Sequence, residues 1–178
     1  MQARLPGRLA RLGLKCQSPP IGKFFSPSSG MEFRTERLIL RPPVEDDEQA
    51  VSAIFGGSRI SRLQHDIDHW RKHGFGRWVL DRNGRIVGFG GLTYRPGFTG
   101  LNLSYHLHPD VWGQGLASEF AVSAVVIGFR DLAAKKVIGL VRPTNLASRR
   151  VLEKAGLRLE CDFPYGGKPG LLYVRFRL

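Results

Sequence analysis

Residues 104–119 read Ser-Tyr-His-Leu-His-Pro-Asp-Val-Trp-Gly-Gln-Gly-Leu-Ala-Ser-Glu, and this stretch decides the fold. An expected strand over residues 100–107 enters a short loop with two glycines, and an expected helix over residues 116–130 follows. The free backbone N–H groups and the positive end of the helix dipole make such a junction an anion site. The loop lacks the Gly-Lys-Ser/Thr of a nucleotide P-loop, and Ser118 stands where a dinucleotide fingerprint has Gly or Ala. The stretch therefore predicts phosphate binding of another kind.

Strands and helices alternate on both sides of this stretch. The strand-helix-strand unit over residues 100–141 predicts a right-handed crossover between two parallel strands. Hairpins at both ends of the chain predict antiparallel pairing elsewhere, and Asn83-Gly84 is a strong two-residue hairpin signal. The pattern predicts an α/β fold: a mixed, mostly antiparallel, seven-stranded sheet with a central parallel pair, flanked by about four helices. The other strands are expected at 36–41, 78–81, 85–94, 137–141, 157–163 and 171–177, and the other helices at 45–55, 61–73 and 147–154.

The 178 residues carry a formal net charge of +12, and the charge is unevenly distributed. Residues 1–30 contain five basic residues, four prolines and no acid, so we predict a basic, largely disordered tail. This tail is interpreted as a nucleic-acid arm, a transit peptide or an upstream extension before a start at Met31, and we favour the extension. Residues 31–178 are predicted to form one domain. Their remaining charge of +7 fits an anionic ligand as well as ordinary surface charge.

Composition disfavours several classes of protein. No apolar run approaches the ~20 residues of a membrane-spanning helix, so no membrane association is predicted. Cys16 and Cys161 form neither a CxxC pair nor a Cys/His cluster, which argues against a disulfide scaffold or structural zinc and favours a reducing, cytoplasmic location. Cys161 is expected in the core. No interleaved aromatic and basic motif supports nucleic-acid binding, which is kept as a runner-up.

Four ordered motifs resemble the GNAT acyltransferase superfamily, and within it the branch of the ribosomal-protein-alanine N-acetyltransferases. The motifs are Thr-Glu-Arg-Leu-Ile-Leu-Arg-Pro at 35–42, Gly-Arg-Ile-Val-Gly-Phe-Gly-Gly-Leu at 84–92, the stretch at 104–119, and Asn-Leu-Ala-Ser-Arg-Arg-Val-Leu-Glu-Lys-Ala-Gly-Leu at 145–157. The resemblance covers residues 32–163. It implies the GNAT fold and acetyl-CoA as co-substrate, with no metal.

The resemblance also implies a cofactor site. Gly115 and Ala117 fit the family's phosphate-loop pattern, and Trp112 replaces its usual first residue. Backbone N–H groups of residues 113–118 would hold the pyrophosphate. Backbone groups of the strand before the loop, and two residues at the start of the helix near 147, would line the pantetheine arm. The implied cofactor-binding residues are Tyr105, His106, Leu107, Trp112, Gly113, Gln114, Gly115, Leu116, Ala117, Ser118, Asn145 and Ser148.

The implied reaction moves the acetyl group from the thioester directly to a primary amine. A protein N-terminal amine is the acceptor that the branch favours. A small-molecule amine is the rival acceptor, and a non-catalytic acyl-CoA-binding sensor is the rival of another class. The sensor gains weight because Leu152 stands where many members have a tyrosine acid. A backbone N–H near residue 107 would stabilise the oxyanion.

The candidates for proton transfer are Tyr105, His106, His108, Glu119 and Ser148. Strand alternation places His106 and His108 on the opposite face from Tyr105 and Leu107. Glu119 is also explained by the helix dipole alone.

Other residues have two interpretations each. His65, His69 and His73 have helical metal-site spacing but are expected on a solvent-facing flank. A set of aromatic residues is either an acceptor wall or core. A pair of arginines either contacts the CoA phosphates or lies on the exposed surface of a helix. The C-terminal hairpin is a candidate homodimer surface. The aromatic set is Trp70, Phe75 and Trp78, and the arginine pair is Arg149 and Arg150.

Overall fold

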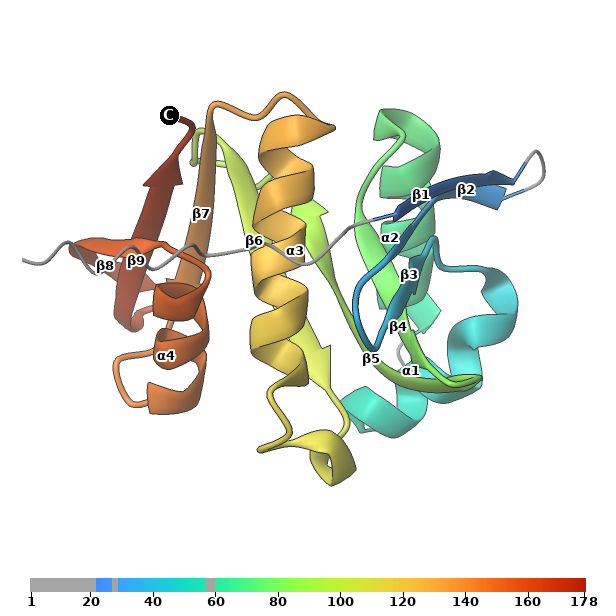
Figure 1. The fold of residues 1–178 in the computed structure, drawn as a ribbon. Coiled ribbons are helices and arrows are strands. Elements are labelled where there is room, and N and C mark those ends of the chain that lie inside the picture. The colour runs from blue at the N-terminus through green and yellow to red at the C-terminus, as the bar shows by residue number, and fades with distance from the viewer. Residues whose placement is uncertain (1–21, 27–28, 57–59) are drawn as a thin grey trace, which may run out of the picture.

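The structure is a computed structural model that describes residues 22–26, 29–56 and 60–178 (Figure 1). Over these residues a single nine-stranded sheet has the order β1-β2-β3-β4-β5-β6-β7-β9-β8. The strands are β1 (Gly22–Ser26), β2 (Ser29–Arg34), β3 (Ile39–Arg41), β4 (Arg77–Arg82), β5 (Arg85–Thr93), β6 (Leu101–Leu107), β7 (Lys136–Val141), β8 (Arg158–Tyr165) and β9 (Lys168–Phe176). The helices are α1 (Glu48–Phe55), α2 (Ile60–His73), α3 (Leu116–Arg130) and α4 (Leu146–Lys154), with 3₁₀ turns at Glu45–Asp47 and Pro109–Val111.

The sheet separates two apolar clusters. Helix α3 is apolar on nearly every side because it lies against the sheet with α4 beside it, and Phe120 has no exposed surface. On the other face, α1 and α2 cover β4 and β5 through a smaller cluster that includes Leu63 and Phe89. Alternation along β4 supplies both clusters, because Trp78 belongs to the first and Val79 to the second. The predicted α/β class, the four helices and the mixed sheet are confirmed.

The central parallel pair is β6 and β7. Their pairing covers only three positions, from Leu101 opposite Val137 to Leu103 opposite Gly139. All other neighbouring strands of the sheet are antiparallel. Since β6 continues to Leu107 and β7 to Val141, the two strands separate toward their carboxyl ends, and this separation creates the site.

The N-terminal part differs from the prediction. Seven strands were expected, and the hairpin β1–β2 accounts for the two additional ones. Residues 36–38 are not strand: Thr35 N–H donates to Leu38 C=O at 2.9 Å, and this turn joins β2 to β3. Strand β2 crosses the predicted tail boundary at residue 30, while residues 1–21 lie outside the described residues. The division into a tail and a domain stays a prediction.

The structure also bears on the predicted burial of Cys161 and on the predicted absence of a membrane-spanning helix. Cys161 is exposed, not buried, because the β8–β9 register shifts between Leu159 and Cys161 and this irregularity interrupts the alternation of faces. Cys16 lies outside the described residues. Within the described ranges, no helix is long and apolar enough to cross a membrane.

Candidate active site

The peptide groups of β6 point alternately to its two neighbours. His108 N–H donates to Val87 C=O at 2.8 Å, and the β5–β6 register pairs His106 with Phe89. In an antiparallel ladder, every second residue bonds to the same neighbour. His106 therefore directs its backbone to β5, while Tyr105 and Leu107 direct theirs toward β7, beyond the last paired residue. The gap between β6 and β7 is thus lined by peptide groups of Tyr105 and Leu107, and only the side chain of His106 is available for a ligand.

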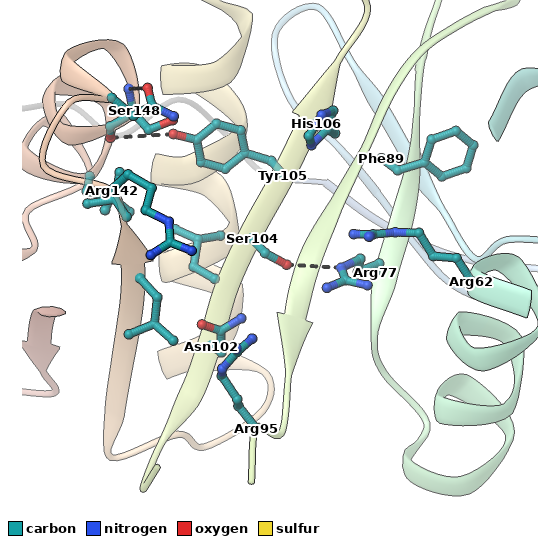
Figure 2. A pocket seen from close by; sticks show the side chains of 15 residues that line it. Arg62, Arg77, Phe89, Arg95, Asn102, Ser104, Tyr105, His106, Arg142 and Ser148 are labelled. Carbon is teal, nitrogen blue, oxygen red and sulfur yellow. Dashed lines mark hydrogen bonds between the residues drawn. The ribbon is translucent and has the colours of Figure 1, made fainter. Parts of the chain in front are cut away.

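A cavity of about 370 Å³ lies at this gap (Figure 2). This volume falls within the usual range of small-molecule sites. Four of the predicted site residues line it from β6 and the start of α4, namely Tyr105, His106, Asn145 and Ser148. Leu152, at the position where the resemblance expects a tyrosine acid, also lines the cavity and is almost fully buried.

The Tyr105 hydroxyl reaches α4 across the gap. Its ring packs edge-on against Phe120 at a centroid distance of 6.2 Å, and its O–H donates to Ser148 C=O at 3.5 Å. Burial raises the pKa of the Tyr105 hydroxyl, so this group stays protonated near neutrality. The Asn145 side chain accepts the Ser148 N–H at 3.1 Å and thereby caps α4. These contacts fix a phenol donor next to the helix that lacks the family's usual tyrosine.

His106 lies on the other face of β6, as strand alternation predicts. Its ring centroid is 4.6 Å from that of Phe55. Burial lowers the pKa of His106, and the positive charges of Arg62 and Arg77 lower it further, so the imidazole is neutral at pH 7 and able to accept a proton. His108 does not line the cavity: it caps the 3₁₀ turn at Pro109–Val111, where its Nδ1 accepts the Asp110 N–H at 3.3 Å.

The glycine loop presents backbone donors at the start of α3. Gly113 and Gly115 have φ values of +74° and +79°, a conformation that glycine adopts without strain. No acceptor for the N–H groups of residues 113–117 is found in the described part of the chain. The Ser118 N–H donates to Gly115 C=O at 3.1 Å, as expected one turn into a helix. The donors available for an anion are therefore those of residues 113–117.

Side chains from the turn before β3 and from the end of β4 hold this loop in place. Arg37 Nη1 donates to Gln114 C=O at 2.9 Å, and Arg82 Nη1 donates to Gln114 Oε1 at 2.6 Å. Trp112 is two-thirds exposed, and its indole N–H donates to Leu107 C=O at 2.9 Å. The loop is thus tied both to β6 and to the turn before β3.

Glu119 belongs to this support and not to the cavity. Its carboxylate accepts from Thr35 Oγ1 at 2.6 Å, from Arg37 N at 2.8 Å and from Arg37 Nε at 2.6 Å. Burial acts to raise the pKa of Glu119, but these hydrogen bonds outweigh it and the pKa is lowered. A carboxylate that accepts three hydrogen bonds away from the cavity is a poor base, so Glu119 is a positioning residue.

The structure shows the surroundings of the aromatic residues, the α2 histidines and Arg149, each of which has two interpretations in the sequence. Trp70, Phe75 and Trp78 pack in or against the main core and do not line the cavity, so the core interpretation is confirmed. His69 is not on an open flank, because its Nδ1 lies 2.8 Å from Phe75 O and its ring packs near Tyr94. No group of three metal-ligating side chains occurs among the residues described. Arg149 contacts Tyr173 Oη and Pro143 O, at 3.2 and 3.3 Å.

Sequence reasoning missed the arginines of the cavity. Arg62, Arg77, Arg95 and Arg142 line it from α2, β4 and the segments after β5 and β7. Arg77 donates to Ser104 Oγ at 3.0 Å and forms an ion pair of 2.9 Å with the buried Asp66. Four positions so far apart in the chain form no local motif. The only signal was the positive charge of residues 31–178.

Comparisons with known proteins agree with this arrangement. Residues 37–158 match the family described as acetyltransferase (GNAT) domain, and the chain therefore belongs to the GNAT acetyltransferase family. The chain is similar to the uncharacterized N-acetyltransferase YoaA of Bacillus subtilis, with 27% identity over 150 residues that cover 72% of this chain and 83% of the relative.

Solved structures share the fold. An acetyltransferase from Agrobacterium tumefaciens has a TM-score of 0.71 at 28% identity, covering 86% of this chain and 97% of that one. RimL, a ribosomal L7/L12 alpha-N-protein acetyltransferase in complex with coenzyme A, has a TM-score of 0.68 at 16% identity, covering 80% and 95%. The family match identifies the chain as an acetyltransferase enzyme.

Proposed function

We propose that this enzyme transfers the acetyl group of acetyl-CoA directly to a primary amine while both substrates are bound. The observation that carries the proposal is the separation of β6 from β7 after Leu103 and Gly139, with a cavity at the gap. Holding thioester and amine in one cavity supplies much of the rate acceleration, because the reaction becomes effectively unimolecular. No metal and no covalent enzyme intermediate are required.

The residues around the gap fit acetyl-CoA. Backbone N–H groups of residues 113–117 bind the pyrophosphate at the positive end of α3. Peptide groups of Tyr105 and Leu107 bind the pantetheine arm and the thioester. The Leu107 N–H is the donor that stabilises the negative charge on the thioester oxygen in the transition state.

Two side chains carry the protons. The lone pair of the amine attacks the thioester carbon while His106 accepts a proton from the amine nitrogen. The tetrahedral intermediate then collapses, the C–S bond breaks, and the thiolate of CoA takes the proton of the Tyr105 hydroxyl. The products are an N-acetylated amine and CoA, and Tyr105 and His106 return to their starting states by proton exchange with solvent. Tyr105 thereby replaces the acid missing at Leu152.

The nature of the amine is a finer part of the proposal. A protein N-terminal amine is one candidate, suggested by the resemblance to the ribosomal-protein-alanine branch, and RimL shares the fold with this chain. A small-molecule amine is the rival, because one fold serves many acceptors. A non-catalytic acyl-CoA sensor is the alternative of another class. A homodimer through the C-terminal hairpin stays a prediction.

Calorimetric titration of the full chain with acetyl-CoA tests the proposal. Gly115→Glu places a negative charge at the loop, and we expect its acetyl-CoA binding to fall by at least about 100-fold. Gly167→Glu is the matched control, because Gly167 also has a positive φ, of +69°, and lies in the β8–β9 hairpin. If both variants stay folded and bind equally well, the loop is not the phosphate site. Binding without acetyl transfer to any amine would favour the sensor.

A further inference from the structure

The wall of the cavity is strongly basic. Arg62, Arg77, Arg95 and Arg142 line it together with His106. No aspartate or glutamate is among the described residues that line the cavity, and Asp66 supports Arg77 from α2. A cavity with this lining is suited to an anion.

Arg77 is held in a fixed position within this wall. Asp66 binds its Nη1 and Ser104 binds its Nε, as Figure 2 shows for the serine. Its Nη2 has no acceptor within the part of the chain that the structure describes, so this edge of the guanidinium can bind a ligand. A guanidinium whose rotamer is already fixed loses little side-chain entropy on binding a carboxylate or phosphate.

The basic wall adjoins the proposed base. The Arg62 guanidinium lies 4.4 Å from the centroid of the Phe55 ring, and the same ring lies 4.6 Å from that of His106. Burial lowers the pKa of His106, and the positive charges of Arg62 and Arg77 lower it further. A ligand bound by these arginines is therefore next to the group that receives the proton of the amine.

This wall is separate from the phosphate loop. None of residues 113–117 lines the cavity, and Arg37 and Arg82 contact the loop without lining the cavity. The pyrophosphate of acetyl-CoA has its own backbone donors at the start of α3. The arginines of the cavity are therefore not needed to bind the pyrophosphate.

We propose, on the basis of the acetyl transfer proposed above, that the acceptor is a small amine carrying a carboxylate or phosphate, and that Arg62, Arg77 and Arg95 bind this anion. Paired N–H groups of arginine match the oxygens of either group. The same positive charges disfavour the ammonium form of the acceptor, which helps it to lose its proton before attack. They also repel acceptors with several positive charges.

The test compares acceptors that differ by one anionic group. Initial rates are measured with the full chain and saturating acetyl-CoA, using an amino acid and its amide, phosphoethanolamine and ethanolamine, and a diamine. The product CoA is quantified by chromatography, because the exposed Cys161 would react with a thiol dye. We expect kcat/KM to be at least about tenfold higher for the anionic member of a pair. The pair with the larger ratio identifies carboxylate or phosphate as the anion.

Variants assign the preference to the wall. Arg62→Gln and Arg95→Gln are expected to bring the ratio within a pair close to one, and they leave the buried Asp66 paired with Arg77. Arg71→Gln is the control: Arg71 is on the same helix as Arg62, is 63% exposed and lies outside the cavity, so the ratio should persist. Equal rates for both members of each pair, or a preference for the diamine, would overturn the inference and leave the acetyl transfer intact. Absence of transfer to every amine would overturn both.

Discussion

The two ends of the candidate site bind anions by different means. At the start of α3, backbone N–H groups of residues 113–117 are the donors, and two glycines with positive φ orient them. On the acceptor side, guanidinium groups from four distant segments line the cavity. A backbone site depends on local conformation, so side-chain changes outside the two glycines leave the donors in place. A side-chain site is lost one residue at a time, which lets acceptor specificity change while cofactor binding is retained.

The largest effect is expected where the two ends meet. His106→Gln removes the proposed base, and we expect kcat/KM to fall by about 10²- to 10⁴-fold, because general-base catalysis contributes effects of this size. Acetyl-CoA affinity should stay within about twofold of wild type, since the backbone of His106 is paired with β5. Steady-state kinetics and calorimetry on the same preparation separate the two quantities. A variant that keeps its kcat/KM would remove His106 from the mechanism.

The pH profile sharpens this prediction. The base must be neutral, and burial with Arg62 and Arg77 places the pKa of His106 below its ordinary 6.5. In the wild type, kcat/KM calculated per unprotonated acceptor amine should therefore be constant near pH 7 and fall as the pH drops through that lowered pKa. Arg62→Gln removes one of the positive charges, so the acid limb should move to higher pH. An unchanged limb in Arg62→Gln would mean that another group titrates.

Tyr105→Phe tests the proposed acid between the two ends. Removal of the hydroxyl should lower kcat by about 10- to 100-fold and leave the acceptor KM little changed, because the thiolate is protonated after the acceptor has bound. The ring itself packs on Phe120 and is retained. Leu152→Tyr in the Tyr105→Phe background, which restores the family's usual residue, is the complementary variant. A kcat unaffected by Tyr105→Phe would leave protonation of the thiolate to solvent.

Much of the fold could be predicted from local patterns. Helix α3 was expected over its observed range, and the β4–β5 turn has the positive φ values of Asn83 and Gly84 that the hairpin signal requires. The parallel pair followed from the crossover rule. The hairpin β1–β2 was missed because proline and basic residues in 1–30 suggested disorder. Cys161 was misplaced because a register shift, which no local pattern reveals, changes the face of the sheet.

The candidate site also has one part that local sequence predicts and one part that it does not. The phosphate loop could be found because its donors come from one continuous stretch at a strand-to-helix junction. The arginine wall could not, because Arg62, Arg77 and Arg95 meet only after α2 packs on the sheet. In the sequence, Glu119 could be a proton-transfer group or a residue that only favours the helix dipole. In the structure, Thr35 and Arg37 donate hydrogen bonds to its carboxylate, which therefore supports the loop. Local sequence predicts where a backbone can bind, whereas tertiary packing decides which side chains face the ligand.

A smaller effect is expected from Glu119→Gln, which weakens the contacts that support the phosphate loop at the start of α3. The amide loses the charge and opposes an N–H donor to Arg37 Nε, so we expect a loss of about 2–3 kcal/mol in the free energy of unfolding at pH 7. Acetyl-CoA affinity should fall severalfold, because Arg37 also holds Gln114 C=O. Chemical denaturation and calorimetry measure the two effects.

The pH dependence of this effect has a defined sign. The folded pKa of Glu119 is lowered from 4.5, so its contribution is complete above about that pH and is lost as the pH falls through the folded pKa. Wild type and Glu119→Gln should therefore converge in stability at low pH. Asp68→Asn, at an exposed ion pair on α2, is the control and should change stability by less than about 1 kcal/mol. A difference that persists at low pH would mean that packing, and not charge, dominates at Glu119.

The smallest effect is expected from Gln114→Ala, and it tests the contrast between the two ends most directly. The Gln114 side chain contacts Arg82 and Asp110 C=O, while its backbone N–H is among the proposed donors to the pyrophosphate. Alanine keeps that N–H, and the bond from Arg37 to Gln114 C=O is independent of the side chain. Acetyl-CoA affinity should therefore change by less than about threefold, since only a partly exposed side-chain contact is lost. A loss as large as that of Gly115→Glu would mean that side chains, and not the backbone, bind the cofactor phosphates, and the two ends would then work by one principle.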